Sequence, residues 1–279
     1  MPKFKLKHPI RKEHLAAEEK GESFSEKAKA KFPFLRHLKW LDPFTYVDLW
    51  VMPRVKKVTD SGAVETVVNV VFAFLFAWIF YTALGILFGS ATPLVIVYSA
   101  SMENTFFRGD VMALSAASQS AFFGPEISLD REIRGVPASS FITPNYSDGR
   151  LESLLFSNGA EVKYEKTGSV IVYPAYPSGL PIIHRTIAKI NAKDGVFFIT
   201  KGDNDSTNPT FDQDCGAVDE LRLASEKPCI TFHAVPAGSI QGVAFFTIPK
   251  AGCLKLWLLD DLLSIVSTGS LPSDFRGIC

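Results

Sequence analysis

Three short segments of this 279-residue chain carry side chains of the types that nucleophilic catalysis requires. The first, residues 98–105 (YSASMENT), places Ser101 directly after an apolar run. A serine hydroxyl is a weak nucleophile and needs a general base within hydrogen-bonding distance. A serine at the end of a strand is usually a turn residue, so the interpretation of Ser101 depends on the other two segments.

The second segment, residues 181–190 (PIIHRTIAKI), supplies the candidate base His184. An imidazole, whose ordinary pKa is about 6.5, can accept a proton near neutral pH. His233 is the other histidine in the same part of the chain as Ser101. The alternative for His184 is a strand histidine that is simply hydrogen-bonded.

The third segment, residues 200–205 (TKGDND), follows another apolar run and has the Gly/Asp/Asn composition of a tight turn. A carboxylate at Asp203 would fix the tautomer of a catalytic histidine and stabilise the imidazolium formed during attack. Asp205, Asp212 and Asp214 are candidates for a further acidic position. Taken alone, the segment is a generic acidic turn.

Residues 66–88 form the longest apolar segment and contain no charged side chain. As an α-helix this segment would extend about 34 Å, enough to cross a hydrocarbon core of about 30 Å. A buried core helix is seldom so long, and a cleaved signal peptide has a shorter apolar stretch nearer the N-terminus. The sequence therefore predicts one transmembrane helix.

Basic residues lie on one side of this span. Arg54, Lys56 and Lys57 precede it, and the next Lys or Arg is Arg108. The positive-inside rule then places the N-terminus in the cytoplasm and the chain beyond residue 90 outside it. The candidate catalytic residues are expected to be extracytoplasmic.

The cytoplasmic region 1–65 has two parts. Residues 1–31 are rich in Lys and Glu and are expected to be disordered or loosely helical. Residues 32–54 are aromatic and interrupted by prolines, which suits a membrane interface or a small partner-binding segment. The whole chain has a formal charge of zero, which argues against a nucleic-acid-binding protein.

The chain beyond the span is expected to be a mainly β domain over residues 89–250. Short runs rich in Val, Ile, Phe and Thr, separated by turn residues, lie at 93–98, 110–114, 169–173, 181–190, 195–200, 230–235 and 240–248. The polar region 116–167 is interpreted as an irregular insertion. In the tail 251–279, an amphipathic stretch suggests a surface or interfacial helix over 254–265.

Four cysteines, Cys215, Cys229, Cys253 and Cys279, follow residue 200. Free thiols are the favoured interpretation, although Cys215 with Cys229 would close a short loop in an oxidising compartment. Their spacing does not suggest a metal site, and no cofactor is expected.

The order SASMExTxxRGD (99–110), PIIHRTI (181–187) and TKGDN (200–204), placed after a membrane span, resembles the signal peptidase I family. The likeness is to the archaeal and endoplasmic-reticulum type, which uses His as the base. It extends from Ser99 to about Ile248, or about half of the chain. The resemblance implies a signal-peptidase-like β domain on an N-terminal transmembrane helix.

The resemblance also implies roles for individual residues. Ser101 would be the nucleophile, His184 the general base and Asp203 the residue that orients His184. Ser99 would line the oxyanion hole, and Met102 would pack beneath the site. The implied reaction removes signal peptides with small residues at positions −1 and −3 from exported preproteins, at a lipid membrane and with other membrane subunits as candidate partners.

The chain departs from the family pattern at several positions. Ala100 stands where the family usually has Gly, and Asn104 where it usually has Pro. Gly168-Ser169 replaces a second Gly-Asp pair. These changes leave the second acidic position open among Asp205, Asp212 and Asp214, and they suggest a divergent subgroup.

Two alternatives remain from the sequence. The first is another class of peptidase, in which Cys215 acts with His233 or Ser101 acts with Lys201. The second is a catalytically inactive, membrane-anchored β domain that binds proteins.

Overall fold

The computed structural model describes residues 42–59, 61–119, 122–176, 178–216 and 229–270. Segment 1–31, the first ten residues of segment 32–54 and the end of the tail lie outside these ranges. The chain divides into two compact units, Met1–Phe80 and Tyr81–Cys279, which are considered separately.

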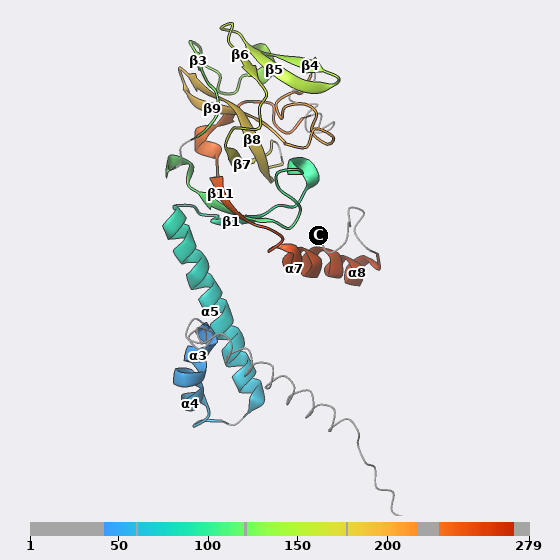
Figure 1. Cartoon of the computed structure of the whole chain (residues 1–279). Coiled ribbons are helices and arrows are strands. Elements are labelled where there is room, and N and C mark those ends of the chain that lie inside the picture. Colours follow the sequence, from blue (N-terminus) through green and yellow to red (C-terminus); the bar gives the residue numbers. More distant parts are fainter. Residues whose placement is uncertain (1–41, 60, 120–121, 177, 217–228, 271–279) are drawn as a thin grey trace, which may run out of the picture. The chain divides into compact units, whose positions relative to one another are not determined.

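The first unit is helical in its described part (Figure 1). Short helical segments α3 (Pro43–Tyr46), η1 (Val47–Val51) and α4 (Met52–Val55) precede the long helix α5 (Gly62–Phe88), which continues into the second unit. None of the α5 residues is buried, and its apolar window has a mean hydropathy of 2.3. Among the described residues α5 is the one helix long and apolar enough to cross a membrane, so the predicted apolar helix is confirmed, with four more residues at its start.

The second unit contains a large sheet of eight strands in the order β1-β2-β11-β7-β8-β9-β10, with β3 beside β8 (Figure 1). The β3–β8 pair is parallel, and the other pairs are antiparallel. The strands are β1 (Leu94–Ile96), β2 (Val111–Ser115), β3 (Glu126–Leu129), β7 (Val170–Pro174), β8 (Pro181–Ala192), β9 (Gly195–Lys201), β10 (Val235–Pro236) and β11 (Gly242–Ile248). The mainly β fold is confirmed. In the expected run 230–235 only Val235 belongs to a named strand.

Residues 116–167 contain regular structure, so the expectation that this region is irregular is wrong. Strands β4 (Ile142–Ser147), β5 (Arg150–Phe156) and β6 (Glu161–Lys163) form a second antiparallel sheet. The β4–β5 turn consists of Asp148 (φ 51°) and Gly149 (φ 72°), and Asp-Gly with both residues at positive φ is a favoured two-residue hairpin loop. The sequence signal for this hairpin was therefore present as a single dipeptide.

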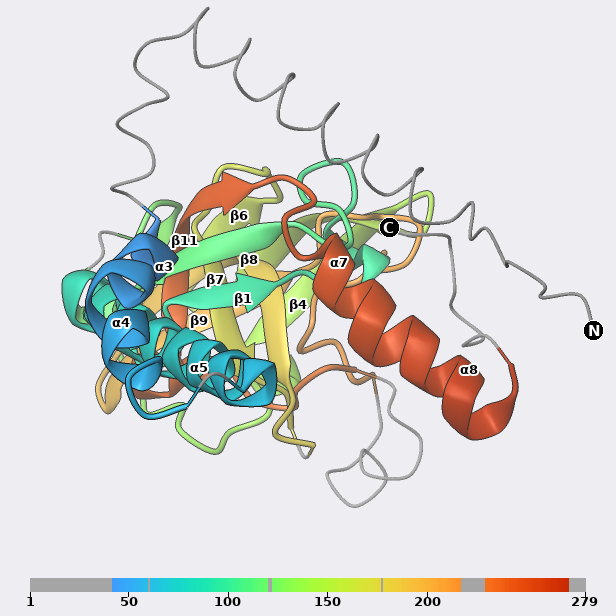
Figure 2. The same ribbon diagram turned by 90° about the horizontal axis from the view of Figure 1, so that it is seen from below.

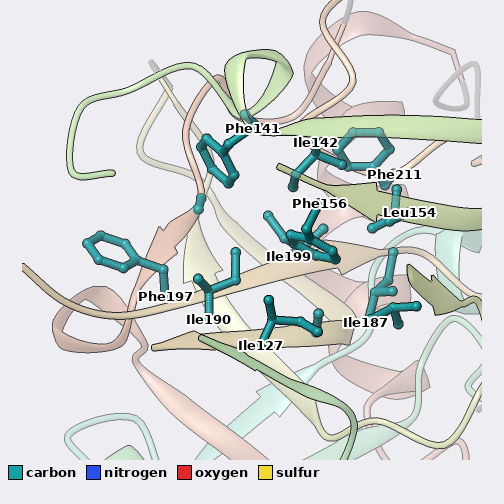
Figure 3. Close-up of a cluster of buried hydrophobic side chains, with 14 of the residues drawn as sticks. Ile127, Phe141, Ile142, Leu154, Phe156, Ile187, Ile190, Phe197, Ile199 and Phe211 are labelled. Carbon is teal, nitrogen blue, oxygen red and sulfur yellow. The ribbon is translucent and has the colours of Figure 1, made fainter. Parts of the chain in front are cut away.

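The small sheet packs against the large one through a shared hydrophobic core (Figure 3). Phe156 and Leu154 of β5 belong to the same buried cluster as Ile187 and Ile190 of β8 and Ile199 of β9. Each of these side chains is at most 2% exposed. Residues 116–167 thus contribute to the hydrophobic core of the second unit, and the small sheet supports the strand that carries His184.

The helical segments α7 (Cys253–Leu256), η6 (Trp257–Leu262) and α8 (Leu263–Thr268) follow one another as one rod (Figure 2). The expected helix over 254–265 is therefore present and is slightly longer. Its start is fixed by two contacts: Gly252 N–H donates to the Gly109 carbonyl (2.8 Å), and Lys250 N–H donates to the Asp110 carboxylate (2.9 Å). The other oxygen of Asp110 accepts from Phe107 N–H at 2.9 Å.

Candidate active site

Ser101 lies in the short 3-10 helix η2 (Ala100–Met102), which is separated from the end of β1 by three residues. Its hydroxyl oxygen is 3.0 Å from the hydroxyl oxygen of Ser99. Ser101 is partly exposed, whereas the adjacent Met102 is 1% exposed and belongs to a core cluster with Met112 and Val172. Met102 therefore fixes the turn in the core while the serine hydroxyl faces the surface.

The loop that carries Ser101 rests on the turn after β9. Asn204 N–H donates to the Ser101 carbonyl, and the Asn204 side-chain amide donates to the Ala100 carbonyl, both at 2.9 Å. A Cβ atom added at Gly202 would lie 2.7 Å from the Ser101 carbonyl oxygen, closer than real Cβ contacts come. Glycine is thus needed at position 202 because the Ser101 backbone approaches the turn so closely.

His184 is buried in β8 and contacts a carboxylate. Its side chain is 2% exposed, and Nδ1 lies 2.8 Å from Oδ2 of Asp212. In the β8–β9 ladder Arg185 pairs with Lys201, so antiparallel register puts His184 level with Gly202. The Cα atoms of η2 and β8 approach within 8 Å of each other. His184 and Ser101 therefore lie around the same glycine turn.

Asp203 does not contact His184, which corrects the expected pairing. Its carboxylate forms a bidentate ion pair with Arg185, with Nε 2.9 Å from Oδ1 and Nη2 2.7 Å from Oδ2. Oδ2 also accepts from the Thr105 hydroxyl at 2.6 Å. Side chains of successive strand residues point to opposite faces, so the acid that binds Arg185 is on the wrong face for His184.

Asp212 takes the position beside His184. Burial raises the pKa of the Asp212 carboxyl, but the charge and hydrogen bond of His184 outweigh burial, with the hydroxyls of Thr200 and Tyr173 adding to them, and the pKa lies below its ordinary range. The carboxylate form is therefore the one that faces the imidazole. A buried carboxylate on Nδ1 leaves Nε2 as the nitrogen that can exchange a proton.

The other candidate acids have different partners. Asp205 forms ion pairs with Lys201 (2.6 Å) and Lys166 (3.4 Å), and Asp214 accepts a hydrogen bond from the Tyr146 hydroxyl. Lys201 is fully buried and also donates to the Gly202 carbonyl at 3.0 Å. Burial lowers the pKa of the Lys201 ammonium, although the hydrogen bond that Lys201 donates to Asp205 opposes this. These two contacts hold the Lys201 side chain within the turn.

The preference for free thiols is wrong for Cys215 and Cys229, which form a disulfide. Cys215 is three residues beyond Asp212, and the Asp212 carbonyl accepts from Ile230 N–H (3.0 Å) and Thr231 N–H (3.1 Å) just past Cys229. A disulfide sulfur is not a thiolate nucleophile, so the Cys215–His233 arrangement is not a catalytic pair in this oxidised state.

Three polar side chains that the sequence analysis did not identify form a chain of hydrogen bonds ending on Asp212. The Tyr173 hydroxyl donates to Asp212 Oδ2 at 2.7 Å, and the Thr200 hydroxyl donates to the Tyr173 oxygen at 3.0 Å. The Gln213 amide donates to the Thr200 hydroxyl at 3.1 Å. Tyr173 looks like part of an apolar strand in the sequence, and its partners come from other strands and loops.

The departures from the family pattern have local physical reasons. Asn104 has a φ of 76°, a conformation closed to proline because its ring fixes φ near −65°. The Ser169 hydroxyl oxygen accepts from Phe123 N–H at 2.9 Å.

Among the described residues, no group of three or more His, Cys, Asp or Glu side chains could hold a metal ion.

Comparison with known proteins agrees with the resemblance of the sequence motifs. The signal peptidase complex catalytic subunit SEC11 of Saccharomyces cerevisiae strain YJM789 is 24% identical over 198 residues, covering 71% of this chain and 84% of that protein. The same subunit from strain RM11-1a matches with the same identity and coverage. No protein-family model matches the chain. With the mainly β fold and the apolar helix α5, this similarity supports the resemblance of the sequence motifs to the signal peptidase I family, with the chain as a divergent relative.

Proposed function

We propose that this chain is a membrane-anchored serine endopeptidase that removes signal peptides from preproteins through an acyl-enzyme on Ser101. The observation that carries the proposal is the buried His184–Asp212 pair beside the turn on which the Ser101 loop rests. Nucleophile, base and orienting acid are the parts that acyl transfer by serine requires. The similarity to a signal peptidase catalytic subunit supports preproteins as the substrate class.

In the proposed reaction the Ser101 hydroxyl attacks the carbonyl carbon of the scissile peptide bond while His184 Nε2 takes its proton. Asp212 keeps the other ring proton on Nδ1 and stabilises the imidazolium. His184 then gives its proton to the leaving amine. Water, deprotonated by the same imidazole, hydrolyses the acyl-enzyme and frees Ser101.

The negative oxygen of the tetrahedral intermediate needs hydrogen-bond donors. The Ser99 hydroxyl, 3.0 Å from the Ser101 hydroxyl, and the Ser101 backbone N–H are the proposed donors. Removing one donor of this kind costs about 3 kcal/mol of transition-state stabilisation. Ser99→Ala is therefore expected to lower kcat with little effect on KM.

We further propose that α5 anchors the enzyme and that the second unit lies outside the cytoplasm. The helix has the required length and hydropathy, and basic residues precede it while none follows before Arg108. Such an anchor would hold the active site where the apolar segment of a preprotein leaves the bilayer. Association with other membrane subunits is also proposed, because the SEC11 relatives are described as subunits of a complex.

The test is cleavage of a model preprotein by the full-length protein in detergent. Ser101→Ala and His184→Ala should abolish cleavage, whereas Ser128→Ala, a change at an exposed serine on β3, should not. His233→Ala separates the two histidines and should retain activity. Cleavage by Ser101→Ala at the wild-type rate would refute the proposal, and absence of cleavage by the wild type would favour the inactive binding domain.

A further inference from the structure

A chain of buried hydrogen bonds ends on the acid of the proposed triad. Gln213, Thr200, Tyr173, Asp212 and His184 are each at most 3% exposed. The described contacts run in one direction: the Gln213 amide donates to Thr200, Thr200 donates to Tyr173, and Tyr173 donates to Asp212. Donors that all point towards one carboxylate polarise one another and strengthen the last hydrogen bond.

Tyr173 and His184 share one acceptor atom. The Tyr173 hydroxyl and His184 Nδ1 lie 2.7 Å and 2.8 Å from the same oxygen, Oδ2 of Asp212. The other oxygen, Oδ1, has no hydrogen-bond partner among the described residues. The Asp212 carboxylate can therefore rotate about its side-chain bond only by breaking both contacts, and Tyr173 opposes such rotation whenever His184 moves.

The backbone of β7 fixes the position of the Tyr173 ring. Tyr173 pairs with Ile182 and Ile171 pairs with His184 in the β7–β8 ladder, so the phenol reaches Asp212 from the strand next to His184. The ring is fully buried in a cluster with Phe198 and Val235. This packing holds the hydroxyl in place, and burial followed by the charge of Asp212 raises the pKa of Tyr173 well above its ordinary range. The phenol therefore keeps its proton near neutral pH and remains a hydrogen-bond donor.

From this geometry we infer that Tyr173 is a positioning residue of the active site, which holds Asp212 in the orientation that His184 requires, and that Thr200 and Gln213 support it. The inference rests on the proposed function and deepens it. Tyr173 acts through Asp212 and does not touch the substrate. Tyr173 lies outside the three sequence motifs that resemble the signal peptidase I family.

Removing the hydroxyl has two expected effects. First, a carboxylate with one contact fewer spends less time in the productive orientation, and kcat should fall by roughly tenfold, equivalent to about 1.4 kcal/mol. Second, a carboxylate without the phenol hydrogen bond keeps more of its negative charge and interacts more strongly with the imidazolium. The acid limb of the kcat/KM profile should therefore move to higher pH.

The direction of this shift in the acid limb also depends on the other groups around Asp212. His184 approaches from β8, Tyr173 from β7 and Thr200 from β9, while Lys201 and Tyr164 act on Asp212 only through longer-range charge interactions. All of these except the removed hydroxyl are unchanged in Tyr173→Phe. A shift of the acid limb is thus assigned to the lost phenol.

The experiment compares full-length wild type, Tyr173→Phe, Thr200→Val, Thr200→Ser and Tyr164→Phe in detergent, with kcat, KM and the pH profile measured for each. Tyr164→Phe is the matched control, because the Tyr164 hydroxyl is buried but has no hydrogen-bond partner among the described residues. We expect a lower kcat, an unchanged KM and a raised acid limb for Tyr173→Phe, a smaller change in the same direction for Thr200→Val, and near wild-type values for Thr200→Ser and Tyr164→Phe.

The inference is overturned if Tyr173→Phe retains the wild-type kcat and acid limb, or if Tyr164→Phe changes both as much. These outcomes differ from failure of the proposed function, in which the wild type itself shows no cleavage that depends on Ser101. Thermal unfolding of each variant separates a loss of fold from a loss of positioning, since the fraction folded at the assay temperature can be applied to kcat.

Discussion

Oδ2 of Asp212 lies 2.8 Å from Nδ1 of His184, and the two side chains are 1% and 2% exposed. Water does not screen a pair buried to this extent, so the carboxylate strongly favours the imidazolium that forms during serine attack. The pair brings together β8 and the loop after β9, and both parts are supported by the core that the two sheets share.

Asp212→Asn should lower kcat by about 10⁴, the size of effect seen when a triad carboxylate becomes an amide and the histidine takes the wrong tautomer. Single-turnover cleavage of a preprotein would measure the loss. Asp214→Asn is the control, since Asp214 accepts from Tyr146 and not from His184. Equal losses in the two variants would contradict the assignment of Asp212.

The Arg185–Asp203 ion pair is expected to be structural. Its side chains are 11% and 0% exposed, and removing one partner of such a pair usually destabilises a protein by about 3–5 kcal/mol because the other charge stays buried. Asp203→Ala should therefore lower the free energy of unfolding strongly. The double variant Asp203→Ala/Arg185→Ala should be less destabilised than the sum of the single variants; strict additivity in denaturant titrations would argue against coupling.

Gly202→Ala should abolish cleavage because the new methyl group meets the Ser101 carbonyl at 2.7 Å and displaces the nucleophile. Gly238→Ala provides the matched control, since a Cβ there has no atom within 4 Å. Cleavage rates and circular dichroism spectra of the two variants would show whether the loss is local. Full activity of Gly202→Ala would mean that the Ser101 loop is not held against this turn.

The Cys215–Cys229 disulfide should stabilise both the fold and the site. The two cysteines are 14 residues apart, and closing a loop of about 15 residues contributes about 3 kcal/mol in the chain-entropy account. Because Asp212 is three residues from Cys215 and its carbonyl is held beside Cys229, Cys215→Ser/Cys229→Ser should lower the thermal midpoint and kcat together. An unchanged kcat at temperatures where the variant is folded would separate the disulfide from the active site.

The proposed orientation predicts which asparagine can carry a glycan. Asn145-Tyr146-Ser147 and Asn204-Asp205-Ser206 both fit the acceptor sequence, but Asn145 is exposed on edge strand β4, whereas Asn204 is buried and bonded to Ala100. In a host with N-glycosylation, the folded protein should carry a glycan that Ser147→Ala removes and Ser206→Ala does not. Gel mobility before and after endoglycosidase treatment would show this.

An engineered acceptor provides the control for orientation. Ala160→Thr creates the sequence Asn-Gly-Thr at exposed Asn158 in the same unit. Modification of Asn158 alone would retain the orientation and reject Asn145 as a site. Absence of a glycan from both positions would place this unit on the cytoplasmic side.

The sequence contained much of the fold because the strands are local patterns. Of the seven predicted runs, six correspond to strands of the large sheet, and the apolar helix is present as expected. The small sheet was missed because β4 contains Pro144, which argues against a strand, and β6 has only three residues, too few to show a pattern. Packing against β8 and β9 supplies the stability that these short segments lack by themselves.

The site was only partly predictable because it depends on contacts between segments that are distant in the sequence. Ser101, His184 and the Gly202 turn occur in recognisable order, but the choice between Asp203 and Asp212 depends on which face of β8 each acid meets. Asp203 is fixed near Arg185 by the turn, and Asp212 returns to β8 through a loop of irregular backbone. The spacing of residues along the chain does not show that the loop brings Asp212 to His184. Nor does it show that the Tyr173 hydroxyl contacts Asp212 there.

The Asp110 carboxylate joins two turns that are 140 residues apart in sequence. One of its oxygens binds Phe107, in the segment that follows Ser101, and the other binds Lys250, just after the last strand. A recombinant protein shortened at the end of β11 would lose the Lys250 and Gly252 contacts and expose Asp110 beside the nucleophile loop. Truncations designed for crystallisation or assay should therefore retain the chain through at least residue 253.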